Sequence, residues 1–179
     1  MTFARILACL IALLPVPAAA QTQAERATNP VVVELFTSQG CSSCPPADKL
    51  FRELAGRDDV IALALHVDYW DYIGWKDEFA DPAYTRRQKS YAREAGRRMI
   101  YTPQLIVNGR EDIVGAHGLE LGELVSRYHA RPARAHVTLS RTGDRLEVQV
   151  APASTALDGP FVVQIVRFAP ERRVSITRG

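Results

Sequence analysis

The sequence is poor in cysteine and has almost no surplus of charge. Three of its 179 residues are cysteine, and 22 Lys and Arg residues balance 20 Asp and Glu residues to a formal net charge of +2. A charge this small gives no reason to expect nucleic acid or an acidic surface as a partner. Internal repeats and low-complexity tracts are also lacking, and the apolar fraction of 47% is ordinary for a globular protein.

The chain also lacks an apolar run of the roughly 20 residues that a membrane-spanning helix needs. Its N-terminus instead carries Arg5, an apolar run from Ile6 to Leu14, and small residues before Gln21. This order is typical of a secretory signal peptide, which predicts that residues 1–20 are removed. We therefore expect the protein to be secreted to the periplasm without stable insertion into a membrane.

Removing residues 1–20 also removes Cys9 and leaves two cysteines, Cys41 and Cys44. They can form a disulfide only with each other or with another protein. A disulfide across so short a loop constrains little of the unfolded chain, so it would be a poor structural crosslink. In an oxidising compartment its expected use is as a reversible redox pair.

The two cysteines lie between a strand-like segment and a helix-like one. Residues 31–36 are a continuous apolar run typical of a buried strand, and residues 47–55 carry apolar side chains at helical spacing. The turn between them places the Cys41 sulfur at a helix N-terminus, where the backbone N–H groups and the helix dipole favour the thiolate. We expect Cys41 to be the exposed nucleophile and Cys44 the shielded resolving thiol.

The patterns after residue 55 predict a mixed α/β order. They indicate a strand over 60–67, a mainly helical segment over 77–98, a strand over 104–107, a hairpin turn at Asn108-Gly109 with a return over 112–115, and a helix over 120–129. The first strand, its helix and the second strand form a right-handed parallel unit, so the ends of both strands open beside the cysteines.

Three segments flank or follow this domain in our interpretation. Residues 21–30 are a polar, flexible lead-in, residues 31–130 are the α/β domain, and residues 134–179 are β-rich. In the last segment, alternation predicts a hairpin over 135–139 and 146–150, and apolar runs predict strands over 161–168 and 174–177. We expect half of a small sandwich that is truncated at Gly179 or lacks its closing strands.

Strand, helix, strand, helix, strand, hairpin, strand and helix is the minimal thioredoxin order, and local motifs agree with it. VELFTSQGCSSC, ending at Cys44, resembles the opening of glutaredoxins. More closely, FTSQGCSSCPP from Phe36, HVDYW from His66 and TPQLIVNG from Thr102 are similar to a secreted thioredoxin-like family, domain of unknown function 1223. This resemblance covers nearly the whole chain after residue 20 and implies a thioredoxin-like fold, a central mixed sheet flanked by helices.

The resemblance also implies site residues. Cys41, Cys44 and Pro103 would be catalytic, because Thr102-Pro103 falls where thioredoxin-like proteins have a Thr and a cis-proline facing the active-site sulfurs. The substrate groove would include Thr102, Tyr69 and Trp70, the last two following the second strand. For Tyr69 and Trp70 an anchoring role in the core is the alternative, and it is the role that we expect for Trp75. We expect His66 to be a hydrogen-bonded core histidine.

Two departures from the superfamily bear on the chemistry. The Ser42-Ser43 dipeptide is neither the Gly-Pro of thioredoxin nor the Pro-Tyr of glutaredoxin, and this dipeptide tunes the redox potential. Glu34 is the nearest counterpart of the buried acid that transfers protons in thioredoxin, with an offset of one residue. Because strand side chains alternate, Glu34 is either that acid or a residue on the strand surface.

Three functions remain open. The first is an enzyme, an exported thiol–disulfide oxidoreductase that acts on protein thiols or disulfides, including those of a redox partner protein, without a cofactor. The second is a protein that holds Cu(I) between the same thiols, since soft thiolates suit that ion; against it, Met99 is the one methionine after residue 20, and no metal site is predicted. The third is a non-catalytic binding module on a thioredoxin scaffold.

Overall fold

The structure is a computed structural model that describes residues 29–154 and 162–177. The predicted signal peptide and nearly all of the predicted lead-in lie outside these residues. Within the described ranges, no helix has the length and apolar character to cross a bilayer.

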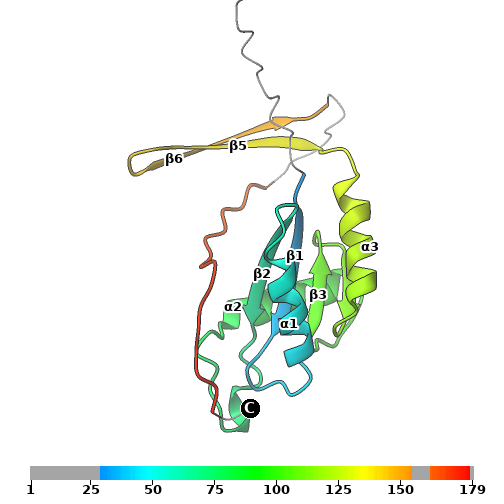
Figure 1. Cartoon of the computed structure of the whole chain (residues 1–179), viewed down its shortest axis with the longest axis vertical. Helices are drawn as coiled ribbons and strands as arrows, with labels where there is room; N and C mark the ends of the chain where they lie inside the picture. Colours follow the sequence, from blue (N-terminus) through cyan, green and yellow to red (C-terminus); the bar gives the residue numbers. More distant parts are fainter. Residues whose placement is uncertain (1–28, 155–161, 178–179) are drawn as a thin grey trace, which may run out of the picture.

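A four-stranded mixed sheet with helices on both faces forms the body of the protein (Figure 1). Its elements are β1 (Val31–Thr37), α1 (Pro45–Leu54), β2 (Val60–His66), the short 3-10 helix η1 (Asp71–Ile73), α2 (Pro82–Glu94), β3 (Gln104–Val107), β4 (Glu111–Val114) and α3 (Gly118–His129). The strand order is β2-β1-β3-β4, with β1 and β2 parallel and the other pairs antiparallel. This arrangement is the thioredoxin-like fold that the sequence predicts.

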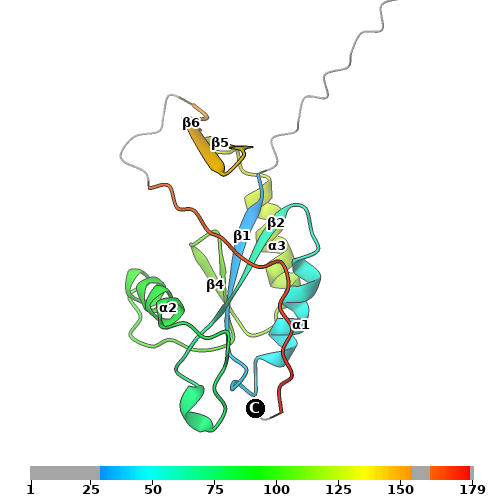
Figure 2. The same cartoon turned by 90° about the vertical axis from the view of Figure 1, so that its left-hand side faces the viewer.

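The side chains of β1 divide between the two faces of the sheet. Helices α1 and α3 cover one face and α2 covers the other (Figure 2). Val33 and Leu35 pack into an apolar cluster with side chains of α1 and α3. Phe36 points to the opposite face, into a cluster that tyrosines of α2 help to close. The central strand is therefore buried on both sides, which is why its sequence is a continuous apolar run rather than an alternating one.

The predicted hairpin turn is confirmed. Asn108 and Gly109 have φ angles of 48° and 67°, the left-handed conformations that a two-residue hairpin turn requires. The turn is also tied to β1, because the Asn108 side chain accepts a hydrogen bond from the backbone N–H of Val32 at 2.9 Å and its own N–H donates back at 2.7 Å. The turn residues thus fix the hairpin against the central strand.

Helix α2 is shorter than predicted. The predicted helical segment over 77–98 is a helix only from Pro82 to Glu94. Asp81 caps its first turn by accepting a hydrogen bond from the Ala83 N–H at 2.7 Å, and Pro82 suits the first helical position because it has no N–H to satisfy. Gly96, with φ of 69°, follows its last turn.

The C-terminal segment is confirmed only in part. The predicted hairpin exists as β5 (Ala135–Thr142) and β6 (Arg145–Pro152), a separate two-stranded sheet. The two further strands predicted over 161–168 and 174–177 are wrong wherever the structure describes these residues, because 162–177 have no strand. Residues 162–177 run along the outside of the body without joining the sheet (Figures 1 and 2). Their backbone therefore lacks the neighbouring strand that a ladder of hydrogen bonds needs.

Candidate functional site

The turn between β1 and α1 carries a disulfide. Cys41 and Cys44 are bonded to each other, with their Cα atoms 5.4 Å apart. The turn is held by its own backbone, since the Cys41 N–H donates to the Ser38 carbonyl and the Cys44 N–H donates to the Cys41 carbonyl, both at 3.1 Å. Cys44 is the N-cap residue of α1 and Pro45 follows it as the first helical residue. The local chain therefore places both sulfurs at the helix N-terminus, as predicted.

The expected exposure of Cys41 is wrong for the disulfide form. Cys41 is 3% exposed and Cys44 is 0% exposed. The reason is that the chain after β2 packs over the turn. A Cβ atom added to Gly40 would lie 3.1 Å from both Trp70 Cβ and Ile73 Cδ1, which is tighter than an ordinary contact, so the glycine eases this close approach. No local pattern around the cysteines indicates this cover, because it comes from residues about thirty positions away.

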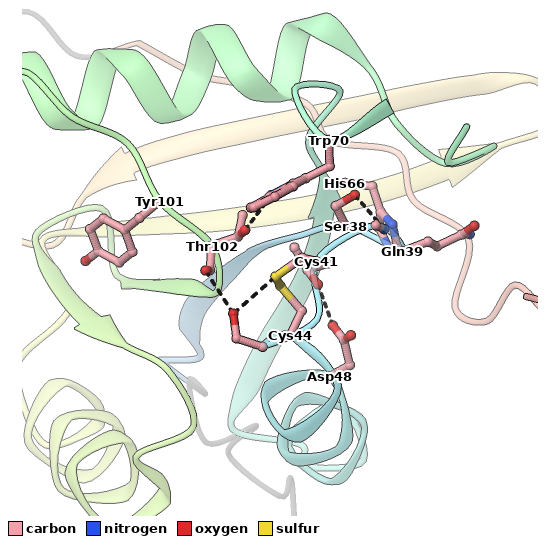
Figure 3. Close-up of a disulfide and its surroundings, with 12 residues drawn as sticks. Ser38, Gln39, Cys41, Cys44, Asp48, His66, Trp70, Tyr101 and Thr102 are labelled. Atoms are coloured by element: carbon pink, nitrogen blue, oxygen red, sulfur yellow. Dashed lines mark hydrogen bonds between the residues drawn. A yellow bond between two sulfur atoms is a disulfide. The ribbon is translucent and has the colours of Figure 1, made fainter. Parts of the chain in front are cut away.

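The loop before β3 brings Thr102 to the disulfide. The Thr102–Pro103 bond is cis, as predicted, and Pro103 is buried. The Thr102 hydroxyl accepts a hydrogen bond from the Trp70 indole N–H at 2.8 Å, and its carbonyl oxygen lies 3.5 Å from Ser43 Oγ (Figure 3). The structure thus assembles Trp70, Thr102 and the cysteine turn from three separate segments of the chain.

Tyr69 points toward α2 and anchors the loop there. Its hydroxyl donates to the Gln88 side chain at 3.2 Å. Gln88, which is fully buried, donates in turn to the Tyr101 carbonyl at 2.6 Å and to the Gln104 side chain at 2.9 Å. Burial raises the pKa of the Tyr69 phenol above its ordinary value. This network joins the segment after β2, which contains Trp70, to the segment before β3, which contains Thr102. It therefore fixes these two segments relative to each other.

Glu34 lies on the face of the sheet opposite α1. It is 2% exposed, so the strand-surface interpretation is wrong. Arg87 of α2 donates to both carboxylate oxygens, at 2.6 and 3.1 Å, and the Tyr91 hydroxyl donates to one of them. Burial, followed by the hydrogen bond to Glu34, raises the pKa of Tyr91. Glu34 thus has a complete set of partners in α2.

Asp48 is a carboxylate of α1, the helix that begins at the disulfide. It was not among the site residues that the sequence predicted. It lies one turn into α1, where its N–H donates to the Cys44 carbonyl at 3.0 Å, and its side chain accepts a hydrogen bond from the Thr37 hydroxyl at 2.8 Å (Figure 3). Burial raises the pKa of Asp48, against the opposing effect of the Thr37 bond. The spacing of four residues from Cys44 is the signal that would have indicated it.

A second polar cluster fixes the loop before Cys41. His66 Nδ1 lies 2.6 Å from Asp77 Oδ2, which also accepts a hydrogen bond from the Gln39 N–H at 2.9 Å. Burial alone would raise the pKa of Asp77, but the hydrogen bonds from His66, Gln39 and Phe79 outweigh it and the pKa is lowered. His66 is therefore hydrogen-bonded, as predicted.

Trp75, in the segment between η1 and α2, is joined to the loop before Cys41 rather than to the apolar core. Its indole N–H donates to the Gln39 side chain at 2.7 Å. Around the disulfide, and elsewhere in the part of the chain that the structure describes, no group of three or more His, Cys, Asp and Glu side chains is arranged to hold a metal ion. The groups that the structure gathers at the site are the two cysteines, the hydroxyls of Ser43 and Thr102, and the Asp48 carboxyl of raised pKa.

Comparisons with known proteins identify one family model and two similar solved structures. The family model described as protein of unknown function DUF1223 matches residues 32–179. The crystal structure of a protein from Agrobacterium tumefaciens is 42% identical in sequence, with a TM-score of 0.62, and the match covers 67% of this chain and 55% of that one. A thioredoxin from Malassezia sympodialis matches at 23% identity over 57% of this chain and 77% of its own, with a TM-score of 0.36.

The chain spans little more than half the length of the Agrobacterium protein. None of the curated proteins is similar enough to count as a relative. The family match extends from β1 through the cysteine turn and the Thr102 loop to the last residue of the chain. The chain therefore belongs to the DUF1223 family.

Proposed function

We propose that this protein is an exported thiol–disulfide oxidoreductase that acts on protein thiols and disulfides through Cys41 and Cys44. One observation carries the proposal. The disulfide lies at the N-terminus of α1 in a thioredoxin-like fold, with Thr102 of the neighbouring loop beside it. A helix N-terminus favours the thiolate, and the thiolate is the form that exchanges with disulfides.

The reaction proceeds in two exchanges. The Cys41 thiolate attacks one sulfur of a partner disulfide, so a Cys41–partner bond forms, the partner S–S bond breaks, and the other partner sulfur leaves as a thiolate that takes a proton from water. Cys44 then gives up its proton and attacks the Cys41 sulfur. The Cys41–Cys44 disulfide forms and the second partner thiolate leaves. Two electrons pass from the dithiol to the partner, and the reverse sequence oxidises a partner dithiol.

Asp48 is the proposed acceptor of the Cys44 proton. It is one helical turn beyond Cys44, and the structure gives it the Thr37 hydroxyl as a hydrogen-bond partner rather than a cation. A carboxyl whose pKa is raised by burial is closer to the pKa of a thiol and exchanges protons with it more readily. Glu34 is less suited, because Arg87 and Tyr91 already occupy its oxygens on the other face of the sheet.

Serine variants of each cysteine test the proposal. The wild-type protein should reduce insulin in the presence of dithiothreitol or speed the oxidative refolding of a reduced disulfide protein, and both Cys41→Ser and Cys44→Ser should abolish this activity. In addition, Cys44→Ser should accumulate mixed disulfides with partner proteins, whereas Cys41→Ser should not, because only the first exchange survives without Cys44.

Three results would count against the proposal. If the wild type and the double serine variant behave alike in both assays, the chain is better described as a non-catalytic binding module. Stoichiometric retention of Cu(I) by the reduced protein, lost in the double variant, would favour metal handling. The exported location has its own test, because the protein isolated from the periplasm of an expressing bacterium should begin at Gln21, and retention of residues 1–20 would contradict it.

A further inference from the structure

The hydroxyl of Ser43 lies between two acceptors. Ser43 Oγ is 3.5 Å from the Cys41 sulfur and 3.5 Å from the Thr102 carbonyl oxygen, and both contacts are drawn as dashed lines in Figure 3. The side chain is exposed, while the two groups that it contacts belong to the buried disulfide and to the loop before β3. Ser43 is therefore a polar connection between the reacting sulfur and the loop beside it.

A serine hydroxyl has one hydrogen, so it donates to one of these acceptors at a time. In the disulfide form the sulfur is neutral and a weak acceptor, and the hydroxyl donates to the Thr102 carbonyl. In the proposed function the reduced Cys41 sulfur reacts as a thiolate. A hydrogen bond to a charged acceptor is roughly twice as strong as one between neutral groups, so the thiolate competes successfully for the same hydrogen.

We propose that Ser43 is a positioning residue whose hydrogen bond passes from the Thr102 carbonyl to the Cys41 sulfur when the disulfide is reduced. This inference rests on the proposed thiol–disulfide function and names a device within the same site. It has two consequences. The donated hydrogen bond stabilises the Cys41 thiolate, and the Thr102 carbonyl becomes free to accept a hydrogen bond from the backbone N–H of an extended partner segment.

The Thr102 carbonyl stays in place when Ser43 no longer donates a hydrogen bond to it. The Thr102 hydroxyl is held by the Trp70 indole, and the preceding Tyr101 carbonyl accepts from Gln88. The reduced protein therefore presents a stabilised thiolate and a free, fixed carbonyl together, whereas the oxidised protein presents neither. This coupling favours an extended polypeptide with a backbone N–H beside its disulfide as the partner of the reduced form.

The pH dependence of Cys41 alkylation provides the first test. In the reduced full-length protein, iodoacetamide labelling of Cys41 is followed by mass spectrometry from pH 4 to pH 10. Ser43→Ala should move the midpoint of the rate profile upward by about one pH unit, the size expected for one hydrogen bond to a charged group. Ser43→Thr should restore the wild-type midpoint, because threonine keeps the hydroxyl.

Ser42 is the matched control. It is the same residue type, also exposed and adjacent, and among the described residues the side-chain hydrogen bonds to the two acceptors come from Ser43 and not from Ser42. Ser42→Ala should therefore leave the midpoint within a few tenths of a unit of the wild type. An unchanged midpoint in Ser43→Ala, or equal shifts in both alanine variants, would overturn the proposal.

The transfer of the Ser43 hydrogen bond can be measured at the Thr102 carbonyl. Its ¹³C chemical shift should change on reduction of the wild type, and this change should be lost in Ser43→Ala and kept in Ser42→Ala. A change of equal size in all three proteins would contradict the transfer. Neither readout needs turnover, so wild-type protein that shows these effects but no activity on protein disulfides would refute the proposed function and leave the role of Ser43 standing.

Discussion

Two carboxylates, Glu34 and Asp48, lie on opposite faces of the sheet and have different surroundings. Glu34 faces α2, where Arg87 and Tyr91 satisfy both of its oxygens. Asp48 faces β1 from α1, with the Thr37 hydroxyl as its hydrogen-bond partner and a pKa that burial raises. An acid held by a cation and a hydroxyl keeps its charge, whereas an acid whose pKa is raised by burial exchanges a proton more readily. We therefore expect substitutions of Glu34 to act on stability and substitutions of Asp48 to act on the proposed proton transfer.

Among the substitutions that test this difference, Glu34→Ala should have the largest effect. We expect the free energy of unfolding to fall by about 2–3 kcal/mol, because the Arg87 charge and the Tyr91 hydroxyl lose their partner. The cost is below that of a fully buried pair because the Arg87 side chain is 41% exposed. Urea unfolding measures the loss, and the midpoint of Cys41 alkylation is the control, which should not move. A stable variant with a shifted midpoint would place Glu34 in the chemistry instead.

Asp48→Asn should have opposite effects on stability and activity. The folded pKa of Asp48 lies above its unfolded value, so its ionisation costs folding free energy as the pH rises through the folded pKa. The variant should therefore unfold at a higher temperature than the wild type at pH 7. At about pH 2, well below the ordinary Asp pKa of 3.8, both side chains are neutral and the two proteins should unfold at the same temperature. Calorimetry at the two pH values measures this difference.

In the same variant the second exchange should slow by about tenfold. The effect is smaller than most general-base effects because a thiol of ordinary pKa is already partly ionised near neutrality. Stopped-flow measurement of mixed-disulfide resolution follows this step. A variant that is less stable at pH 7 yet fully active would remove Asp48 from the proposed mechanism.

Thr37→Val removes the one hydroxyl that the structure places on the Asp48 carboxylate. We expect a loss of about 1 kcal/mol in the free energy of unfolding at pH 7 and a further rise in the pKa of Asp48, because this hydrogen bond favours the ionised form. Carboxyl ¹³C titration of Asp48 measures the pKa directly. Thr37→Ser, which keeps a hydroxyl, is the matched control, and a pKa that falls in the valine variant would contradict the interpretation.

The smallest effect concerns the tyrosines that donate to acidic partners. Burial raises the pKa of Tyr91, and burial with the Asp112 hydrogen bond raises that of Tyr101 to about 12. Unfolded tyrosines lose their protons near pH 10 while these two keep theirs, so the free energy of unfolding should fall as the pH rises from 10 to 12. Tyr91→Phe should make this slope shallower by up to about one proton per molecule. A slope that does not change would show that Tyr91 titrates normally.

Local patterns in the sequence determine much of the fold. The apolar run of β1, the left-handed Asn108-Gly109 turn and the buried face of α3 each depend on residues within a few positions of one another. The cysteine turn is equally local, because the spacing of Cys41 and Cys44 and the prolines after them are sufficient to place both sulfurs at a helix N-terminus.

Only the tertiary structure decided how these parts meet. The ion pair of Glu34 joins residues 53 positions apart, and the bond from Trp70 to Thr102 joins residues 32 positions apart. Distant residues also decide the packing of Trp70 and Ile73 against the turn at Gly40. Residues 162–177 form no strand because their apolar run has no neighbouring strand to pair with. Propensity and periodicity report on the backbone around a residue, whereas burial, pKa and pairing depend on which distant side chains fill the space beside it.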